Sequence, residues 1–223
     1  MKVVNKLLSI IFVIAIVILT LTVSIGLPIY IRPFYYAHVY SLDMGEMWGI
    51  DVSDEEIIEA YDEVLDFLTL EGEEFGTGVF PFSEEGKGHF EDCKVLFDLN
   101  RNALIVSFVI VVTLLVLNKI GKIKLSRPRG YSLGFYAGIG TLSLCVLLGV
   151  LIASNFAVAF RIFHQIFFPG KTNWMFNPYK DPIVLFMPQK FFMNCAILIG
   201  ASIVTISTVL ILAGIIGRRK TNK

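Results

Sequence analysis

The stretch LLSIIFVIAIVILTLTVSIGLPIYI, residues 7–31, contains no charged side chain. Three further stretches, 102–118, 130–160 and 191–217, share this property. A helix needs ~17–25 predominantly apolar residues to cross a bilayer, and a helix satisfies its own backbone polar groups in lipid. The sequence, which is 55% hydrophobic, therefore predicts an all-α membrane protein with four transmembrane helices.

A secretory signal peptide is an alternative interpretation of the first stretch. Lys2 and Lys6 precede it and resemble the basic region of such a peptide. However, the apolar run exceeds the ~7–15 residues typical of signal peptides, and the best cleavage site, Ser24-x-Gly26, is weak. We therefore favour an uncleaved transmembrane helix.

The charges predict how the helices are oriented. All 19 acidic residues lie in segments 32–101 and 161–190. The remaining flanking segments carry only basic residues, namely Lys2, Lys6, Lys119, Lys122, Lys124, Arg127, Arg129, Arg218, Arg219, Lys220 and Lys223. Because basic segments stay in the cytoplasm, both termini are expected there and the acidic segments outside. No basic outer patch accompanies the net charge of zero, so nucleic acid is not an expected partner.

These observations divide the chain into eight segments. The predicted order is transmembrane helix 1 (1–31), an extracellular cap (32–101), transmembrane helix 2 (102–119), a basic cytoplasmic loop (120–130), transmembrane helix 3 (131–160), an aromatic extracellular loop (161–190), transmembrane helix 4 (191–217) and a basic cytoplasmic tail (218–223). In the cap, DVSDEEIIEAYDEVLDFL places Ser53 and Glu56 at capping-box spacing ahead of apolar residues at helical period. The cap is therefore expected to be mainly helical. Its acidic residues are expected to form a solvated face: Asp54, Glu55, Glu59, Asp62, Glu63 and Asp66.

Known catalytic sequence signatures are absent. The three cysteines, Cys93, Cys145 and Cys195, have no regular spacing and do not indicate a disulfide framework or a metal motif. Phosphate-binding loops, serine-hydrolase elbows and H-E-x-x-H helices are not found.

Histidine is the remaining candidate for chemistry, since its imidazole titrates near neutral pH. All three histidines, His38, His89 and His164, lie in the predicted outer segments. A single histidine at a membrane surface is usually an amphipathic anchor. Nothing in the sequence around His38 indicates a different role. His89 precedes Asp92 by three residues and His164 follows Arg161 by three, which favours a functional role for these two.

The height of His89 above the membrane limits any joint action with His164. If residues 89–102 continued transmembrane helix 2 in a straight line, His89 would stand ~20 Å above the bilayer, at 1.5 Å per residue. We therefore predict an oblique path or a break near DLNRN, residues 98–102, that brings both imidazoles to one patch of lipid. Rings more than ~15 Å apart would exclude joint acid–base catalysis.

Two stretches, GHFEDCKVLF at 88–97 and FHQIFFPGKTNWMF at 163–176, resemble the bacterial lipoprotein intramolecular transacylases (Lit). The similarity includes four helices, a cap between the first two, H-x-x-D before helix 2 and F-H-x-x-F-F after helix 3. Cys93 departs from the small aliphatic residue expected after H-x-x-D. This family moves the sn-2 acyl chain of a diacylglyceryl-modified N-terminal cysteine to the α-amino group of that cysteine, which gives a lyso-form lipoprotein.

The resemblance also implies residue roles. The two catalytic histidines of the family fall on His89 and His164, and the sequence leaves open which is base and which is acid. Two further roles are hypotheses from position and not from the resemblance: Asp92, three residues after His89, orients an imidazole, and Arg161, three residues before His164, holds lipid or an oxyanion. Aromatic side chains are expected to form a dry clamp for the acyl and glyceryl groups: Phe163, Phe167, Phe168 and Trp174. The implied partners are the lipoprotein N-terminus and membrane lipid, with no cofactor and no metal.

Two alternatives of other classes stay open. One is a metal-dependent membrane hydrolase with His89, Asp92 and His164 as ligands, although that ligand set is thin. The other is a non-catalytic adhesion or channel subunit of the claudin or connexin type. Such proteins depend on extracellular disulfides, whereas Cys93 is the one cysteine in the predicted cap.

Overall fold

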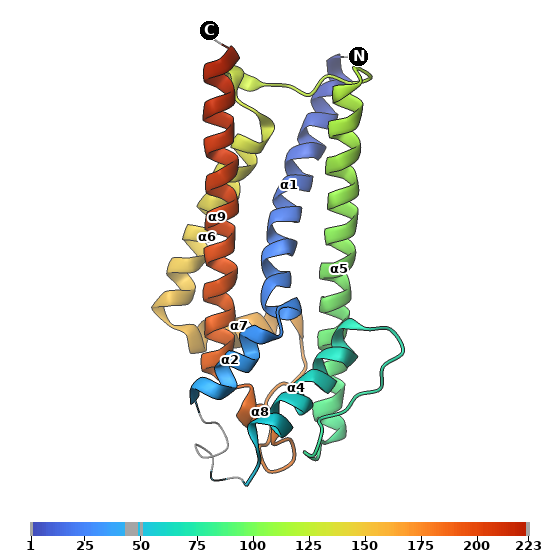
Figure 1. The fold of residues 1–223 in the computed structure, drawn as a ribbon, viewed down its shortest axis with the longest axis vertical. Coiled ribbons are helices and arrows are strands. Elements are labelled where there is room, and N and C mark those ends of the chain that lie inside the picture. Colours follow the sequence, from blue (N-terminus) through green and yellow to red (C-terminus); the bar gives the residue numbers. More distant parts are fainter. Residues whose placement is uncertain (1, 43–48, 50, 222–223) are drawn as a thin grey trace. The chain divides into compact units, whose positions relative to one another are not determined.

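The computed structural model describes residues 2–42, 49 and 51–221, and these residues form helices without any strand. Parts of the predicted cap (43–48 and 50) and the end of the predicted tail (222–223) lie outside the described residues. The α-helices are α1 (Lys2–Tyr30), α2 (Pro33–Leu42), α4 (Asp54–Thr69), α5 (Glu84–Lys119), α6 (Leu133–Ser154), α7 (Phe156–Phe167), α8 (Ile183–Phe186) and α9 (Gln189–Thr221) (Figure 1).

Four helices are long and apolar enough to cross a membrane, as the uncharged runs predicted. They comprise Val3–Tyr30, Glu84–Lys119, Leu133–Ser154 and Gln189–Arg219, and each contains an 18-residue stretch with a mean hydropathy of at least 2.1. Each exceeds or reaches the ~20 residues that span the hydrocarbon core. The predicted all-α fold class with four membrane-length helices is confirmed.

The chain forms two compact units. The first comprises Met1–Gly26, Asn100–Leu151 and Leu198–Lys223, and the second comprises Leu27–Leu99 and Ile152–Ile197. The second unit holds all three histidines and is the part of the molecule relevant to chemistry.

Close helix packing characterises the first unit. An added Cβ at Gly138 of α6 would lie 2.8 Å from the backbone oxygen of Ser207, and one at Gly214 of α9 would lie 2.6 Å from Cβ of Phe135. Small residues of this kind allow membrane helices to approach closely, because lipid offers no hydrophobic drive for association. A buried cluster joins α1, α5 and α6: Phe12, Ile16, Leu114, Leu133 and Ala137.

In the second unit, α4 begins with the capping box that the sequence predicted. The Ser53 hydroxyl accepts a hydrogen bond from the Glu56 N–H at 3.2 Å, and the Glu56 carboxylate accepts one from the Ser53 N–H at 2.8 Å. These bonds satisfy amide groups that have no partner inside the helix. The apolar face of α4 then packs on α2 and α8.

Two tyrosines form the centre of this packing. The rings of Tyr35 and Tyr61 stack with centroids 3.6 Å apart. The buried Tyr35 hydroxyl donates to the backbone oxygen of Phe186 at 2.9 Å, so α2, α4 and α8 are joined through one side chain. This contact also satisfies a polar group that would otherwise be costly to bury.

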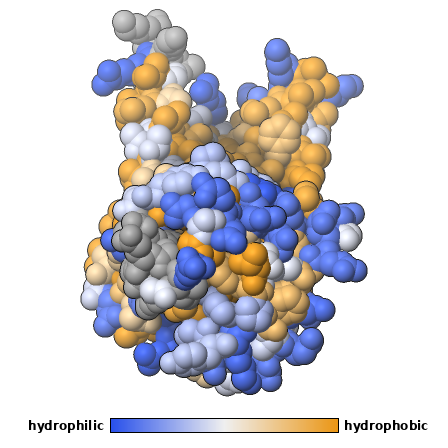
Figure 2. Space-filling model, turned by 60° about the horizontal axis from the view of Figure 1, so that its bottom comes forward, coloured by the Kyte–Doolittle hydropathy of each residue, from blue (hydrophilic) through white to orange (hydrophobic). Residues whose placement is uncertain are grey.

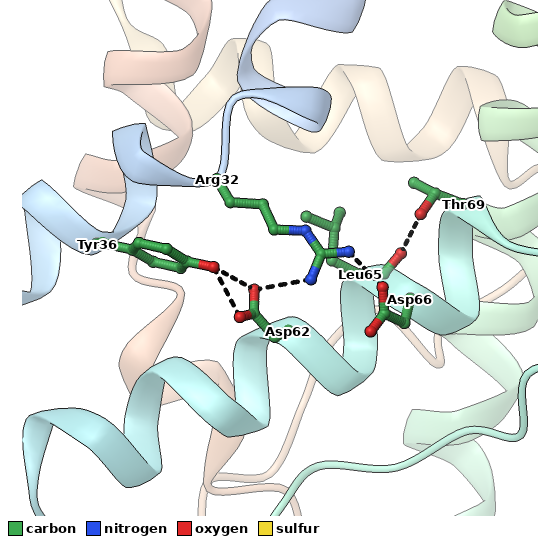
Figure 3. A network of polar contacts seen from close by, with 6 residues as sticks. All are labelled: Arg32, Tyr36, Asp62, Leu65, Asp66 and Thr69. Atoms are coloured by element: carbon green, nitrogen blue, oxygen red, sulfur yellow. Dashed lines mark hydrogen bonds and ion pairs between the residues drawn. The ribbon is translucent and has the colours of Figure 1, made fainter.

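Arg32, between α1 and α2, binds the acidic face of α4 (Figure 3). Its guanidinium contacts the Asp62 carboxylate at 3.1 Å and also pairs with Asp66. The Tyr36 hydroxyl donates to Asp62 at 2.7 Å. Asp62 and Asp66 on the acidic face are therefore partly exposed and paired with Arg32, a contact that the sequence did not predict. The face of the second unit seen in Figure 2 is largely hydrophilic.

We expect Arg32→Ala to lower the free energy of unfolding by about 0.4–2 kcal/mol, the sum of two partly exposed ion pairs of about 0.2–1 kcal/mol each. The side chains of Arg32, Asp62 and Asp66 are 30%, 28% and 37% exposed, which limits the effect. The measurement is thermal unfolding of the purified protein in detergent. Glu59→Gln is the control, because Glu59 is exposed and lies on α4, the helix that also carries Asp62 and Asp66. Equal melting temperatures for Arg32→Ala and Glu59→Gln would contradict a stabilising network.

Helix α5 is continuous from Glu84 to Lys119, so the break predicted near residues 98–102 is wrong. The physical reason is that residues 89–120 contain neither proline nor glycine. The start of the helix is fixed by Ser83, whose hydroxyl accepts from the Gly86 N–H at 3.0 Å. The buried Asp181 carboxylate accepts from the N–H and the hydroxyl of Ser83 at 2.7 and 2.9 Å.

The uncharged run 130–160 does not form one helix, which corrects the extent of the third predicted helix. Helix α6 ends at Ser154, and Asn155 has an extended backbone with φ −161° and ψ 95°. The Asn155 side chain accepts from the Val158 N–H at 3.1 Å and caps a new helix, α7. Asparagine favours this position because its carbonyl satisfies an otherwise unpaired amide.

Candidate active site

His89 of α5 and His164 of α7 meet inside the second unit. Their ring centroids are 5.7 Å apart, with the planes inclined at 32°. The two residues are only 5% and 7% exposed. The prediction that the two imidazoles lie close together is confirmed, and α7 brings this about while α5 remains unbroken.

Aromatic side chains enclose both imidazoles. The edges of Phe168 and Phe176 contact His89 at centroid distances of 5.0 and 5.4 Å. Trp174 stacks on His164 at 4.6 Å, and Phe160 lies 4.3 Å from the same ring. Phe168 and Trp174 were predicted at this site, whereas Phe160 and Phe176 were not. The apolar walls favour neutral imidazoles and limit access of water.

The tautomer of His164 follows from one hydrogen bond. Its Nδ1 lies 2.7 Å from the backbone oxygen of Phe160. A carbonyl oxygen can only accept, so Nδ1 carries the hydrogen and Nε2 of the neutral ring carries a lone pair. Burial lowers the pKa of His164 below its ordinary value of 6.5, and the bond to Phe160 opposes this only in part. The His164 ring is therefore neutral at neutral pH, and Nε2 is the nitrogen that can accept a hydrogen bond.

In His89 the nitrogen with a protein neighbour is Nε2, whereas in His164 it is Nδ1. Nε2 of His89 lies 3.5 Å from Sγ of Cys93, one turn further along α5. Its Nδ1 is buried and has no hydrogen-bond partner among the described residues. A buried polar atom without a partner is uncommon in folded proteins. Nδ1 is therefore the ring nitrogen of His89 that the described part of the protein leaves without a partner.

Asp92 contacts a loop in place of the imidazole that it was expected to orient. Its carboxylate accepts hydrogen bonds from Lys171 and from Asn173, the latter at 3.2 Å. The Trp174 indole in turn donates to the backbone oxygen of Lys171 at 3.1 Å. Asp92 thus holds the loop that carries Trp174 and was not predicted to pair with Lys171.

The remaining predicted residues lie around the histidines at different distances. Phe163 contacts His164 at 5.4 Å, and Phe167 contacts Phe163 at 4.7 Å. Arg161 is exposed and lines an open hollow of 560 Å³. Other residues lining this hollow include Gln165, Phe168, Lys171 and Trp174. A basic group therefore borders the space beside the predicted clamp.

The metal-hydrolase alternative gains no support from this geometry. Within residues 2–42, 49 and 51–221, no three His, Cys, Asp or Glu side chains are grouped as metal ligands. Asp92, the expected third ligand, instead pairs with Lys171.

A family model for lipoprotein intramolecular transacylase Lit matches residues 10–192. The chain belongs to the Lit family. Membership makes it an acyl-transferring enzyme that is integral to a membrane. No curated protein matches the chain.

Solved structures of Lit share this fold. The lipoprotein intramolecular transacylase Lit from Bacillus cereus, determined in meso, has a TM-score of 0.88 and 22% sequence identity, with 100% of this chain and 99% of that chain covered. Two variants of the same bacterial protein have a histidine replaced by arginine or by alanine. Both have TM-scores of 0.80 and 21% identity, and cover 99% of this chain and 95% or 96% of theirs. At these identities the comparison establishes the fold.

In this member of the Lit family, α7 exposes an apolar stripe. Val158, Ile162 and Ile166 recur every four residues and are 45%, 47% and 65% exposed. Helical geometry places them together on one side of α7, away from the buried His164. In an integral membrane enzyme, a stripe of this kind suits the boundary between lipid and water.

His38 lies in a different environment. Its ring contacts Phe191 at 5.5 Å, and its Nδ1 lies 3.5 Å from the amide nitrogen of Asn194. Burial lowers the pKa of His38, and the charge of Lys190 lowers it further. Nε2 of His38 is buried without a partner among the described residues, as is Nδ1 of His89, but the His38 ring packs on Phe191 and not on a second imidazole. His38 is therefore the control in tests of this Lit family member.

Proposed function

We propose that the enzyme transfers the sn-2 acyl chain of a diacylglyceryl-modified lipoprotein to the α-amino group of the same N-terminal cysteine. The amine attacks the ester carbonyl, a C–N bond forms and the C–O bond to glycerol breaks. One proton moves from the nitrogen to the glyceryl oxygen, so neither water nor a cofactor is consumed. The observation that carries the proposal is the pair of buried imidazoles 5.7 Å apart in a member of the Lit family.

His164 is the base in this reaction. An α-amino group has a pKa of ~7.7–8, so part of the substrate is a neutral nucleophile at neutral pH. Attack makes the nitrogen strongly acidic, and Nε2 of His164 accepts its proton. The bond from Nδ1 to the Phe160 carbonyl holds the ring in the tautomer that this step requires.

His89 stabilises the opposite charge. As the tetrahedral intermediate forms, the ester carbonyl oxygen becomes negative. A buried N–H donor that has no competing partner is well placed to bind such an oxygen, because no solvent reorganisation is needed. Nδ1 of His89 is buried without a partner among the described residues, and it meets this description when it carries the ring hydrogen. The His164 imidazolium then returns the proton to the departing glyceryl oxygen.

The substrate supplies its own nucleophile, so no serine or cysteine nucleophile is required. Amine and ester belong to one molecule, and well-oriented intramolecular partners reach effective molarities of ~10⁵–10⁸ M. The role of the aromatic walls is to hold the substrate in this geometry and to keep out water, which would hydrolyse the ester.

The site is proposed to face the outer side of the cytoplasmic membrane. The supporting observation is the distribution of charge: all acidic residues lie in segments 32–101 and 161–190, and these are assigned outside. The apolar stripe of α7 would rest at the lipid surface and place the ester near His164. Arg161, at the hollow beside Trp174, is proposed to bind a carbonyl oxygen of the substrate.

Mass spectrometry of a defined lipopeptide tests the function. Product and substrate are isomers, so fragmentation must locate the acyl chain on nitrogen while the intact mass stays constant. Mixing a lipopeptide with a heavy peptide and one with a heavy acyl chain separates intramolecular from intermolecular transfer. We expect N-acylated product without exchange of label, and none in vesicles lacking the protein. Acyl chains that remain on glycerol would overturn the proposal.

The pH dependence of kcat/KM should show two ionisations on its acid side. The substrate amine must be neutral, which gives a slope of one in log(kcat/KM) below ~7.7–8. His164 must also be neutral, and because burial lowers its pKa, the slope should increase to two only below pH 6.5. His164→Asn should lose this second limb. A second limb above pH 6.5 would contradict the assignment of His164 as a buried base.

A further inference from the structure

The contact between His89 and Cys93 has no role in the proposed reaction. Cys93 follows His89 by one helical turn of α5, and Sγ lies 3.5 Å from Nε2. It also departs from the small aliphatic residue that the resemblance leads us to expect at this position. Nδ1 on the other side of the same ring is buried and has no partner within the described part of the chain. The two observations concern the two nitrogens of one imidazole.

We propose that Cys93 is a positioning residue, whose thiol fixes the tautomer of His89. A thiol is a weak donor and sulfur a weak acceptor, whereas the unprotonated nitrogen of imidazole is a good acceptor. The favourable arrangement is therefore S–H of Cys93 donating to Nε2 of His89. Since a neutral imidazole carries one hydrogen, that hydrogen is then on Nδ1. The thiol makes Nδ1 a donor.

This arrangement gives the two histidines complementary functions. Both carry hydrogen on Nδ1, but His164 uses that hydrogen on the Phe160 carbonyl and presents a lone pair. His89 accepts from Cys93 and presents its N–H. Without the thiol, the ring would favour the Nε2–H tautomer that neutral histidine prefers in water. Nδ1 would then carry a lone pair, and the site would contain two acceptors and no donor for an oxyanion.

The effect of Cys93 on the rate of acyl transfer rests on the proposed function. Its effect on the tautomer of His89 does not. An aliphatic side chain at this position would fill the same space and supply no hydrogen. The inference therefore concerns a device of this particular chain. Its alternative is a purely structural role, since a buried thiol also packs as a small apolar group.

Nitrogen-15 NMR of histidine-labelled protein in bilayers distinguishes the two roles. The chain has three histidines, so the spectrum is simple, and His89→Asn identifies the signals of His89. Protonated and unprotonated ring nitrogens have well-separated shifts. We expect Nδ1 of His89 to be protonated in the wild type and in Cys93→Ser. In Cys93→Ala the hydrogen should move to Nε2, while the control Cys195→Ala should match the wild type.

The same variants are compared for lipopeptide turnover. Cys93→Ala should slow transfer about fivefold, the factor typical of one net hydrogen bond, and Cys93→Ser should restore it. Protonated Nε2 in the wild type, or an unchanged tautomer in Cys93→Ala, would overturn the inference. A tautomer that moves without a change in rate would support the positioning role and contradict the donor role of His89 in the proposed function.

Discussion

Replacement of His164 by asparagine should strongly slow acyl transfer and preserve the local structure of α7. The amide nitrogen of asparagine occupies nearly the same place as Nδ1, so it can still donate to the Phe160 carbonyl. Asparagine has no atom that corresponds to Nε2. The variant therefore removes the base and retains its anchor. Because a general base contributes about 10²–10⁴-fold, we expect a loss of that size.

The loss is measured as single-turnover conversion of the lipopeptide by the purified variant. His38→Asn is the matched control, since His38 is also buried but contacts Phe191 and Asn194. The control should retain wild-type activity. Conversion by His164→Asn within tenfold of the wild type would show that Nε2 of His164 is not the base.

Asparagine and glutamine should have different effects at position 89. The nitrogen left for substrate is Nδ1, and the amide of asparagine can place an N–H near that position. Glutamine reaches towards Nε2, where Cys93 lies. We expect His89→Gln and His89→Ala to lose about 10²–10³-fold in kcat, as is typical when one oxyanion donor is removed. His89→Asn should retain a larger share of activity.

The readout is kcat at saturating lipopeptide, where loss of a transition-state contact is separated from loss of binding. Thermal unfolding of each variant checks that α5 is intact. Higher activity of His89→Gln than of His89→Asn would mean that Nε2 performs the chemistry. Wild-type activity in all three variants would remove His89 from the mechanism.

The membrane helices were predictable because an uncharged run of bilayer length seldom forms anything but a membrane-spanning helix. The end of α6 was not, since Asn155 sits in an apolar run whose hydropathy hardly changes there. An N-cap at Asn155 was the only available signal. For α5, charged residues between Glu84 and Arg101 suggested a separate cap segment. The lack of proline and glycine after His89 was the better guide to one continuous helix.

The candidate site was predictable at its histidines and less so at their surroundings. Asp92 was assigned to an imidazole because it follows His89 by three residues in the sequence. Its actual partner, Lys171, is distant in sequence and comes into reach through the fold of the 168–182 loop. Phe176 and Phe160 were hidden among many aromatic residues. Cys93 was noted only as a departure, because sequence spacing does not say which ring atom a thiol contacts.

The acceptor that holds His164 is a backbone carbonyl, and this affects how the enzyme can change over evolution. A carboxylate in the same place could be lost by a single nucleotide change. The oxygen of Phe160 belongs to the main chain and persists whichever residue occupies position 160. Substitutions there alter the packing against the imidazole, while the hydrogen bond depends on the helical geometry of α7 alone. The orientation of the His164 ring is thus protected against most point mutations at position 160.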